Sequence, residues 1–508
     1  MRQISRTSMG ILCVLAILVC PSAARADNPT MESYTKAREV IDAAVAAAGG
    51  AERLNGIETV ALTTSGTGWA RNQSPKVDRP YEANQRDGRL ILDLAGNRLL
   101  VEFDGEFPGG VFATRTVITA DAKFVLNLRA KTIQHNDALD PANFDFWHRL
   151  FPPLMLRKAV QQAASLHYLG ISKLDGKPHH MVSFAWDNGL TPTLYIDTES
   201  HMVSKYELLF PDNLTGDAVS ELAFPGYRDV DGIQVPVGYT QTIAGDLAAD
   251  IRYTDVRINT PVDDAEFDAP YGFRGIAPPP TGSAKVVELA DDVYLVDGLA
   301  NFGYSVFWVA FDDYILVFDA PVNRAVTAQA IGLIKAEVPD KPIRYAVLSH
   351  HHDDHSGGIA AFVDEGTTIV TTKANQAYLE QMAASSSTLA GEPTPEPGKP
   401  TFEFVDHKRV FSDAGHLVEV HDIGPGPHAE EMLIFYLPKE KMVHQGDLLG
   451  IPRSGSVAPA NDVTVHFAEA IRELGLDVKF ISDVHGTVGN ITDLDLALAK
   501  RKALDAKG

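Results

Sequence analysis

The chain has 508 residues, which is too long for one ordinary domain, so two or three domains are expected. Its 67 acidic and 44 basic residues give a formal net charge of −23, and a surface this acidic argues against nucleic acid as a partner. Both cysteines, Cys13 and Cys20, lie close to the N-terminus. The rest of the chain therefore cannot form a disulfide, and it offers only nitrogen and oxygen atoms as metal ligands.

Residues 1–26 have the pattern of a secretory signal peptide. Arg2 and Arg6 precede an apolar run, and a small-x-small site predicts cleavage after Ala26. Cleavage removes three arginines and no acids, so the formal net charge falls from −23 to −26. The run is too short to span a bilayer, so we expect a periplasmic or secreted protein without stable membrane insertion. The alternatives are an uncleaved anchor and a lipid attached at Cys20.

Residues 27–273 are expected to form a β-rich domain. An alanine-rich helix is predicted at 31–48, before two glycines, and an aromatic-rich helix at 141–166. Apolar and β-branched runs between turn signals predict strands at 89–94, 98–103, 180–186, 193–197, 203–210, 235–243 and 250–258. Residues 274–284 contain three consecutive prolines and are predicted to be an interdomain linker.

Residues 285–508 alternate between strand and helix signals, a pattern typical of α/β layering. Strands are predicted at 293–296, 304–310, 314–318, 343–348, 368–371, 417–420, 432–436, 441–444 and 478–481. Helices are predicted at 325–336, at 466–474 and from about residue 494 onward. Eleven of the seventeen histidines lie in this part of the chain. We therefore expect the chemistry to reside here.

Four histidines and two aspartates occupy the six positions 350–355, one residue after the apolar run 345–348. Only one register of the pattern H-x-H-x-D-H fits, and it selects His350, His352, Asp354 and His355. Imidazole and carboxylate are the usual ligands of zinc and similar ions. Alternate residues of an extended segment point the same way, so the first two can share one ion while the adjacent pair reaches a second. A solvated histidine-rich loop is the alternative, but it is costly beside a buried strand.

Three more candidate ligands stand at the ends of predicted strands. His428 follows a Gly-Pro-Gly-Pro turn, Asp447 follows Gln445-Gly446, and His485 follows the strand at 478–481. Each of them alone is more often a satisfied polar residue than a ligand. Because all three follow strands, we expect them to form one constellation with the histidine-rich loop.

This order of ligands resembles that of the metallo-β-lactamase-fold hydrolases, and so does the segment GPGPHAEEMLIFYLPKEKMVHQGDLL at 424–449. The resemblance covers about 286–504 and implies an αβ/βα sandwich. It also implies that one ion is held by His350, His352 and His428, a second by Asp354, His355 and His485, and that Asp447 bridges both. Asp319 matches the family's early supporting aspartate. The extra polar residues His351 and Asp353 are expected to support the ligands or to face solvent, and Val484 replaces a frequent glycine.

The resemblance implies an exported dinuclear metal-dependent hydrolase. Two ions ~3.5–4 Å apart can share a hydroxide that attacks a carbonyl, and Asp354 would orient this hydroxide as the catalytic residue. We find no Gly-x-Ser-x-Gly sequence that would indicate a serine nucleophile. Zinc is the expected metal, with iron or manganese as alternatives, because the same ligands suit all three.

The substrate is expected to be a small molecule with an ester or lactone carbonyl. A bridging Asp447 resembles glyoxalase-II-like thioesterases and lactonases, whereas β-lactamases tend to carry cysteine or serine there, so β-lactam hydrolysis is disfavoured. Export argues against a glutathione thioester. The loops at 299–303, 384–400 and 450–461 are expected to wall the pocket. The alternatives are a periplasmic lipid- or lipoprotein-binding protein with a non-catalytic hydrolase domain, and an iron-dependent sulfur dioxygenase of the same fold.

The N-terminal domain resembles periplasmic lipoprotein-carrier-type β domains. The resemblance rests on AAGGAERLNGIETV at 47–60, YRDVDGIQVPVGYT at 227–240 and DVRINTPVDDAEFDAP at 255–270. It implies a curved antiparallel sheet around an apolar groove closed by helices. Aromatic residues such as Trp147 and Phe151 would line such a groove, although ordinary core packing is the favoured interpretation.

Overall fold

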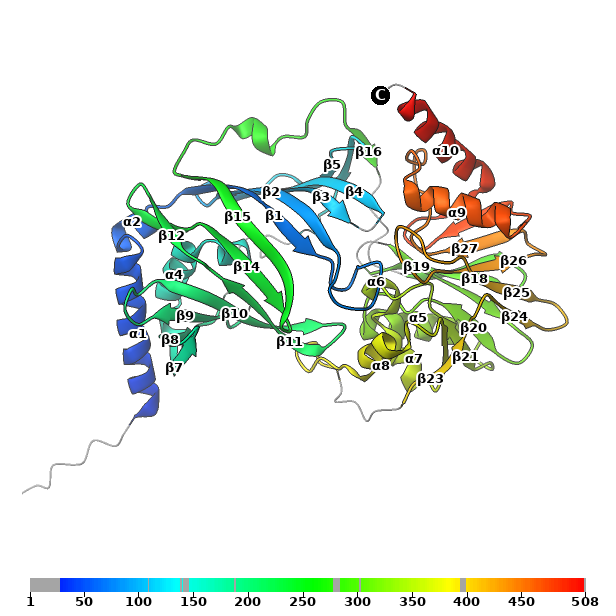
Figure 1. The fold of residues 1–508 in the computed structure, drawn as a ribbon, viewed down its shortest axis with the longest axis horizontal. Helices are drawn as coiled ribbons and strands as arrows, with labels where there is room; N and C mark the ends of the chain where they lie inside the picture. Colours follow the sequence, from blue (N-terminus) through cyan, green and yellow to red (C-terminus); the bar gives the residue numbers. More distant parts are fainter. Residues whose placement is uncertain are drawn as a thin grey trace, which may run out of the picture.

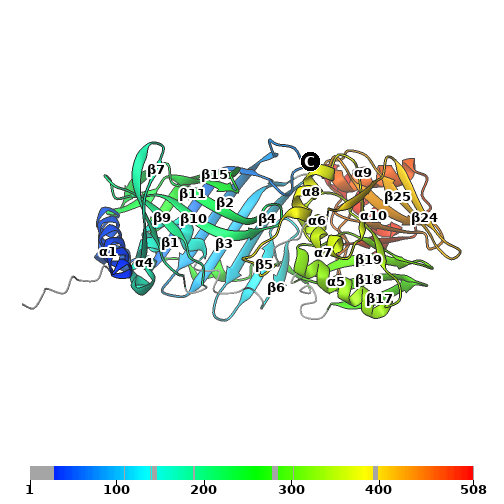
Figure 2. The same ribbon diagram turned by 90° about the horizontal axis from the view of Figure 1, so that it is seen from below.

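The computed structural model describes residues 28–107, 109–137, 139, 146–186, 189–276, 284–300, 303–392 and 399–506. The predicted signal peptide and most of the predicted linker lie outside these residues. The chain forms two parts that lie side by side in both views, an N-terminal part built on a large sheet and a C-terminal part of sheets and helices (Figures 1 and 2). In the described residues, none of the helices is both long enough and apolar enough for a membrane span.

One 14-stranded sheet dominates the N-terminal part, in the order β16-β6-β5-β4-β3-β2-β1-β15-β14-β11-β10-β9-β8-β7. Its strands are β1 (Thr59–Trp69), β2 (Ala83–Asp93), β3 (Arg98–Phe107), β4 (Gly110–Ile118), β5 (Lys123–Asn127), β6 (Thr132–His135), β7 (His167–Leu174), β8 (Lys177–Ser183), β9 (Thr193–Asp197), β10 (Val203–Asp212), β11 (Gly216–Ala223), β14 (Gly238–Ile243), β15 (Asp246–Ile258) and β16 (Arg274–Ile276). The hairpin of β12 (Tyr227–Val230) and β13 (Ile233–Pro236) forms a separate small sheet.

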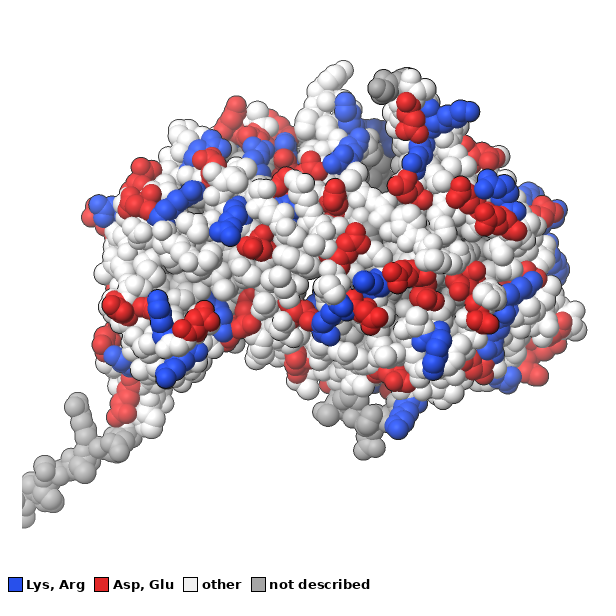
Figure 3. All heavy atoms as spheres, viewed as in Figure 1, with Lys and Arg blue, Asp and Glu red and all other residues white. Residues whose placement is uncertain are grey.

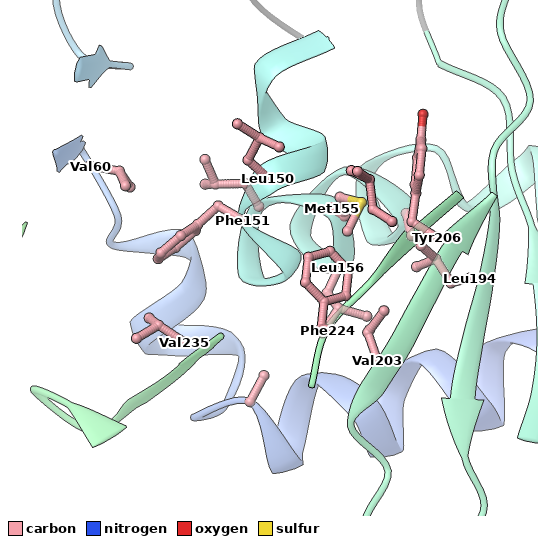
Figure 4. Close-up of a cluster of buried hydrophobic side chains, with 14 of the residues drawn as sticks. Val60, Leu150, Phe151, Met155, Leu156, Leu194, Val203, Tyr206, Phe224 and Val235 are labelled. Atoms are coloured by element: carbon pink, nitrogen blue, oxygen red, sulfur yellow. The ribbon is translucent and has the colours of Figure 1, made fainter. Parts of the chain in front are cut away.

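Helices fill the space beside this sheet with apolar side chains. They are α1 (Pro29–Ala47), α2 (Ala51–Asn55) and α4 (Pro152–Gln161). Figure 4 shows residues of and before α4, among them Phe151 and Met155, in the same cluster as Leu194 and Tyr206 of the strands. Phe151 is fully buried and Trp147 is half-buried against this cluster. The favoured interpretation of these aromatic residues, core packing, agrees with this arrangement.

Three predictions for the N-terminal part need correction. The predicted strand at 235–243 is divided because its first part, β13, pairs with β12, whereas its second part, β14, pairs with β15 of the large sheet. Within the described residues of the predicted helix at 141–166, residues 146–147 and α4 are α-helical, with single 3-10 turns at His148–Leu150 and Ala163–Ser165. The predicted linker begins with a strand, since β16 pairs in parallel with β6.

Two sheets form the centre of the C-terminal part. The first contains β17 (Lys285–Ala290), β18 (Val293–Leu299), β19 (Tyr304–Ala310), β20 (Ile315–Phe318), β21 (Ile343–Val347), β22 (Thr368–Thr371) and β23 (Thr401–Phe404). The second contains β24 (Lys408–Ser412), β25 (Leu417–Asp422), β26 (Leu433–Leu437), β27 (Met442–Gln445), β28 (Phe480–Asp483) and β29 (Val488–Asn490). Each predicted strand of this part corresponds to one of these within a few residues.

The two sheets pack face to face, because one cluster of buried side chains draws on both, including Phe307, Phe318 and Phe435. Further apolar clusters join the sheets to helices α5 (Arg324–Glu337), α7 (Ile359–Asp364), α8 (Gln376–Ala384), α9 (Asp462–Glu473) and α10 (Ile491–Asp505). Helices α5, α7 and α8 lie on the side of the sheets opposite α9 and α10 (Figure 1). Acidic and basic side chains are interspersed over the face in Figure 3, so the acidic excess forms no single patch there.

We expect Phe435→Ala to destabilise the chain by about 3–5 kcal/mol, because the ring is fully buried where the two sheets meet. Its centroid lies 4.2 Å from that of Phe318. The control Val410→Ala, at a position that is 49% exposed, should change stability by less than about 0.5 kcal/mol. Calorimetric or urea unfolding of the full chain measures both. Equal losses for the two variants would contradict this account of the core.

Candidate metal centre

The histidine-rich loop leaves the first sheet at the carboxyl end of β21 and turns into the short helix α6 (Asp353–Ser356). Asp319, at the end of the neighbouring strand β20, is fully buried and accepts hydrogen bonds from Ser349 N at 2.7 Å and Ser349 Oγ at 3.0 Å. The carbonyl of His355 accepts a hydrogen bond from Ala320 N at 2.8 Å. The loop is therefore fixed to the adjacent strand by buried hydrogen bonds. Asp319 has the supporting place that the resemblance implied.

All seven predicted ligands are brought together in two groups whose ligand atoms lie within 4.8 Å of one another. These groups are His350, His352, His428 and Asp447, and Asp354, His355, Asp447 and His485. Asp447 belongs to both. The arrangement has the composition that the sequence predicted, while binding of metal by these residues stays a proposal.

Asp447 faces each group with a different oxygen. Its Oδ2 lies 3.2 Å from His428 Nε2 and 4.0 Å from His350 Nε2. Its Oδ1 lies 2.9 Å from His485 Nε2 and 3.2 Å from His355 Nε2. Gly446 permits this approach, because a side chain there would meet Ser349 Oγ at 3.0 Å. One carboxylate can thus serve two ions.

The donor atoms fit divalent ions. His352 Nδ1 is buried and has no hydrogen-bond partner in the described part of the chain, while His352 Nε2 donates to the Ser74 carbonyl at 3.0 Å. The lone pair of His352 Nδ1 is therefore available to a metal ion held by the first group of ligands. His350 Nε2 and His428 Nε2 stand 3.2 Å apart. Such a convergence of nitrogen and carboxylate oxygen in a buried place is the usual environment of a metal ion.

The second nitrogen of two further ligands is also held. His350 Nδ1 lies 2.9 Å from Ser349 Oγ, and His355 Nδ1 lies 2.8 Å from Asp319 Oδ2. Since these contacts use Nδ1, the Nε2 atoms are the ones presented to the centre. Such contacts fix the tautomer and the direction of metal-binding imidazoles.

Burial and charge divide the imidazoles into two kinds. Burial, reinforced by neighbouring imidazoles, lowers the pKa of His350 and His352 well below its ordinary value. Burial also opposes the charge of His355 and His485, but Asp447 and other carboxylates raise the pKa of His355 well above its ordinary value and that of His485 to about 10. His350 and His352 therefore offer neutral nitrogens, whereas His355 and His485 hold protons when no metal is present.

Of the two extra polar residues of the motif, His351 does not face solvent, so that alternative is wrong for it. His351 is buried, with its ring 5.4 Å from that of Tyr378 in an edge-on contact. Asp353 is half-buried and accepts hydrogen bonds from Asn72 at 3.2 Å and Gln73 at 2.9 Å. These two residues, and Asn213, which donates to Asp353 Oδ2 at 3.4 Å, come from the N-terminal part.

Several residues of the site had no place in the sequence analysis. Asp483 is buried, accepts hydrogen bonds from Ile451 N at 2.7 Å and His485 N at 3.1 Å, and has its pKa raised by burial to about 7. Its position two residues before a candidate ligand was a usable signal. The Tyr304 ring stands edge-on to His485, with centroids 4.9 Å apart. Residues 72–74 carried no signal at all, because their partners lie about 280 residues further along the chain.

A cavity of about 740 Å³ opens beside His485 and is lined by both parts of the chain. Residues 450–452 and 455–459 form one wall, as predicted for the loop at 450–461. The described residues of the other two predicted walls, at 299–303 and 384–400, do not line it. Gly303 instead accepts a hydrogen bond from Arg453 at 2.9 Å, and Ser387 and Thr388 bind Asp217 of β11. Residues 301–302 of the first of these loops and 393–398 of the second lie outside the described residues.

Residues 299–482 match the family model described as "Metallo-beta-lactamase superfamily". Among solved structures, a metallo-beta-lactamase from Pontibacter korlensis is 19% identical, with 43% of this chain and 99% of that chain covered and a TM-score of 0.34. The metallo-beta-lactamase FIM-1 from Pseudomonas aeruginosa, in its mono-zinc form, is 21% identical, with 44% and 98% covered and a TM-score of 0.34. Likenesses at this level assign no activity. No curated protein matches the chain.

We expect the metal-free chain to bind two equivalents of zinc. His485→Ala should reduce this to one, because it removes a ligand of the second group only, and Asp447→Ala should weaken both sites. His407→Ala, at an exposed position, is the control and should keep two equivalents. Zinc titration against a chromophoric chelator, with elemental analysis, gives the stoichiometry. Two tightly bound ions in Asp447→Ala would contradict the proposed bridge.

Zinc binding should release protons at pH 7.5. An imidazole must lose its proton to bind metal, and His485, with its pKa raised to about 10, carries one at this pH. Affinity for the second ion should therefore rise with pH up to about 10. Calorimetric titration in two buffers with different ionisation enthalpies measures the release. The same binding enthalpy in both buffers would show that no proton leaves.

Proposed function

We propose that this chain, whose residues 299–482 belong to the metallo-β-lactamase superfamily as the sequence indicated, is an exported metal-dependent hydrolase of ester or lactone substrates. The observation that carries the proposal is Asp447, whose two oxygens face two separate groups of ligand atoms. The likeness of the N-terminal part to lipoprotein carriers, and export through a signal peptide, stay predictions.

His350, His352 and His428 would hold one ion, Asp354, His355 and His485 would hold the other, and Asp447 would bridge them. Two divalent ions bound there would activate a water molecule at neutral pH and polarise a carbonyl group. We propose zinc, with iron or manganese as the alternatives, because a set of nitrogen and oxygen ligands suits all three.

Asp354 is the proposed catalytic residue. Its Oδ2 lies 3.2 Å from His485 Nε2 and 3.4 Å from His355 Nε2, so this oxygen is directed into the second group. Burial disfavours the carboxylate, but His355 and His485 hold its pKa well below its usual range. A carboxylate that stays ionised can accept a hydrogen bond from the attacking water and orient it.

The cavity beside His485 supports a substrate with an apolar body. Ile276 and Ile451 contribute apolar surface, while Arg274 and Lys500 bring positive charge to the same cavity. His485 keeps 35% of its side chain exposed, so the second group is accessible to solvent. An ester or lactone with an apolar acyl chain, and with an acidic group elsewhere, matches this lining.

Hydrolysis of chromogenic esters or of lactones should be lost on metal removal and restored by zinc. Asp354→Asn should lower kcat by about 100-fold or more, because it removes the ionised oxygen directed into the second group. Asp340→Asn, at an exposed position, is the control. Turnover by the metal-free chain would refute the proposal. Copurified lipid without hydrolysis of esters, lactones, thioesters or phosphoesters would favour a binding protein, and oxygen consumption with a persulfide would favour a sulfur dioxygenase.

A further inference from the structure

The loop at 70–82, which connects β1 and β2, leaves the N-terminal sheet and lies against α6 (Figure 1). Two backbone hydrogen bonds join it to the C-terminal part. Asp353 N donates to the Asn72 carbonyl at 3.3 Å, and Glu430 N donates to the Pro75 carbonyl at 2.7 Å. Glu430 lies two residues after His428, so the loop contacts two of the three segments that supply the first group of ligands.

Gln73 touches a proposed ligand directly. Its side-chain Nε2 donates to Asp354 Oδ1 at 2.8 Å and to Asp353 Oδ1 at 2.9 Å. Because Oδ1 of Asp354 is occupied in this way, the other oxygen is the one that faces His355 and His485. A carboxylate held at one oxygen has a fixed direction for the other, which is how contacts behind a ligand tune a metal site.

Ser74 touches a second proposed ligand through its backbone. Its carbonyl accepts the proton of His352 Nε2 at 3.0 Å, which leaves Nδ1 as the nitrogen with a free lone pair. Ser74 is itself fully buried, and its Oγ accepts a hydrogen bond from Glu82 N at 3.1 Å across the loop. The carbonyl therefore has a fixed position.

The base of the loop is held by buried charge pairs. Arg71 is 6% exposed and pairs with Asp212 at 2.7 Å and with Asp246 at 3.0 Å. Asn213, which follows Asp212 in the chain, donates to the Val322 carbonyl at 2.8 Å and to Asp353 Oδ2 at 3.4 Å. The loop at 70–82 and the segment around Asn213 therefore both donate hydrogen bonds to the carboxylate of Asp353.

We propose that the N-terminal part completes the metal centre, with Gln73 and Ser74 as positioning residues for Asp354 and His352. In this assignment Asp353, an extra acid within the ligand motif, is the residue to which the N-terminal part binds. The inference rests on the proposed metal centre and adds to it a group from outside the matched family segment. A simple docking contact would explain the bonds to Asp353, but it would not require Gln73 to reach a ligand.

Zinc binding by the full-length chain tests this assignment, with Gln73→Ala compared against Asn72→Ala. Both variants lose a side-chain hydrogen bond to Asp353, but only Gln73 also binds Asp354. Gln73→Ala should weaken the second zinc by about 10–100-fold and leave the first unchanged. Asn72→Ala should bind both ions within about twofold of the wild type. The visible spectrum of the cobalt-substituted chain should change in Gln73→Ala alone.

Wild-type affinity for both ions in Gln73→Ala would overturn the inference, and so would equal weakening in the two variants, which would indicate docking only. If the wild type binds no zinc, the proposed metal centre itself fails, a result distinct from either of these. Should Gln73→Ala not fold, Gln73→Asn is the second variant, since its shorter amide keeps the loop polar but does not span both carboxylates. The same loss of the second zinc is then expected, and wild-type affinity would refute the inference.

Discussion

The cost of placing imidazole and carboxylate groups in a buried position is the constraint on which the C-terminal part depends. Four of the proposed ligands, His350, His352, His355 and His428, are at most 6% exposed. Such groups remain in a protein interior only when each has a partner for its charge or its lone pair. The loops that follow the strand ends bring these ligands and their partners together.

Asp319 illustrates how that cost is met. Its carboxylate is fully buried, and burial raises its pKa, but three donors surround it. Two come from Ser349, and the third is His355. One side chain thereby fixes the start and the end of the ligand loop at once. Because β20 and β21 are parallel neighbours, their carboxyl ends lie at the same edge, and a residue following one strand can reach the loop that follows the other.

Much of the site could be predicted from the sequence because its signals are local. The spacing of His350, His352, Asp354 and His355 fixes a register within six residues, and each later candidate stands just after a strand with a clear apolar pattern. Tertiary pairing decided what the sequence could not show. The short strand β16 exists because it pairs with β6, and the predicted strand at 235–243 is divided because its two parts pair with different strands, β12 and β15. Neither contact leaves a pattern in its own segment.

The contact between Gln73 and Asp354 makes the two halves of the chain interdependent. If binding of an ion and seating of the β1–β2 loop favour the same position of one carboxylate, each must strengthen the other by the same free energy. The affinity of the centre for its second ion and the stability of the contact between the loop at 70–82 and the C-terminal part then both report the same coupling free energy. A change on the surface between the parts, far from any ligand, would alter how much metal the chain retains when metal is scarce.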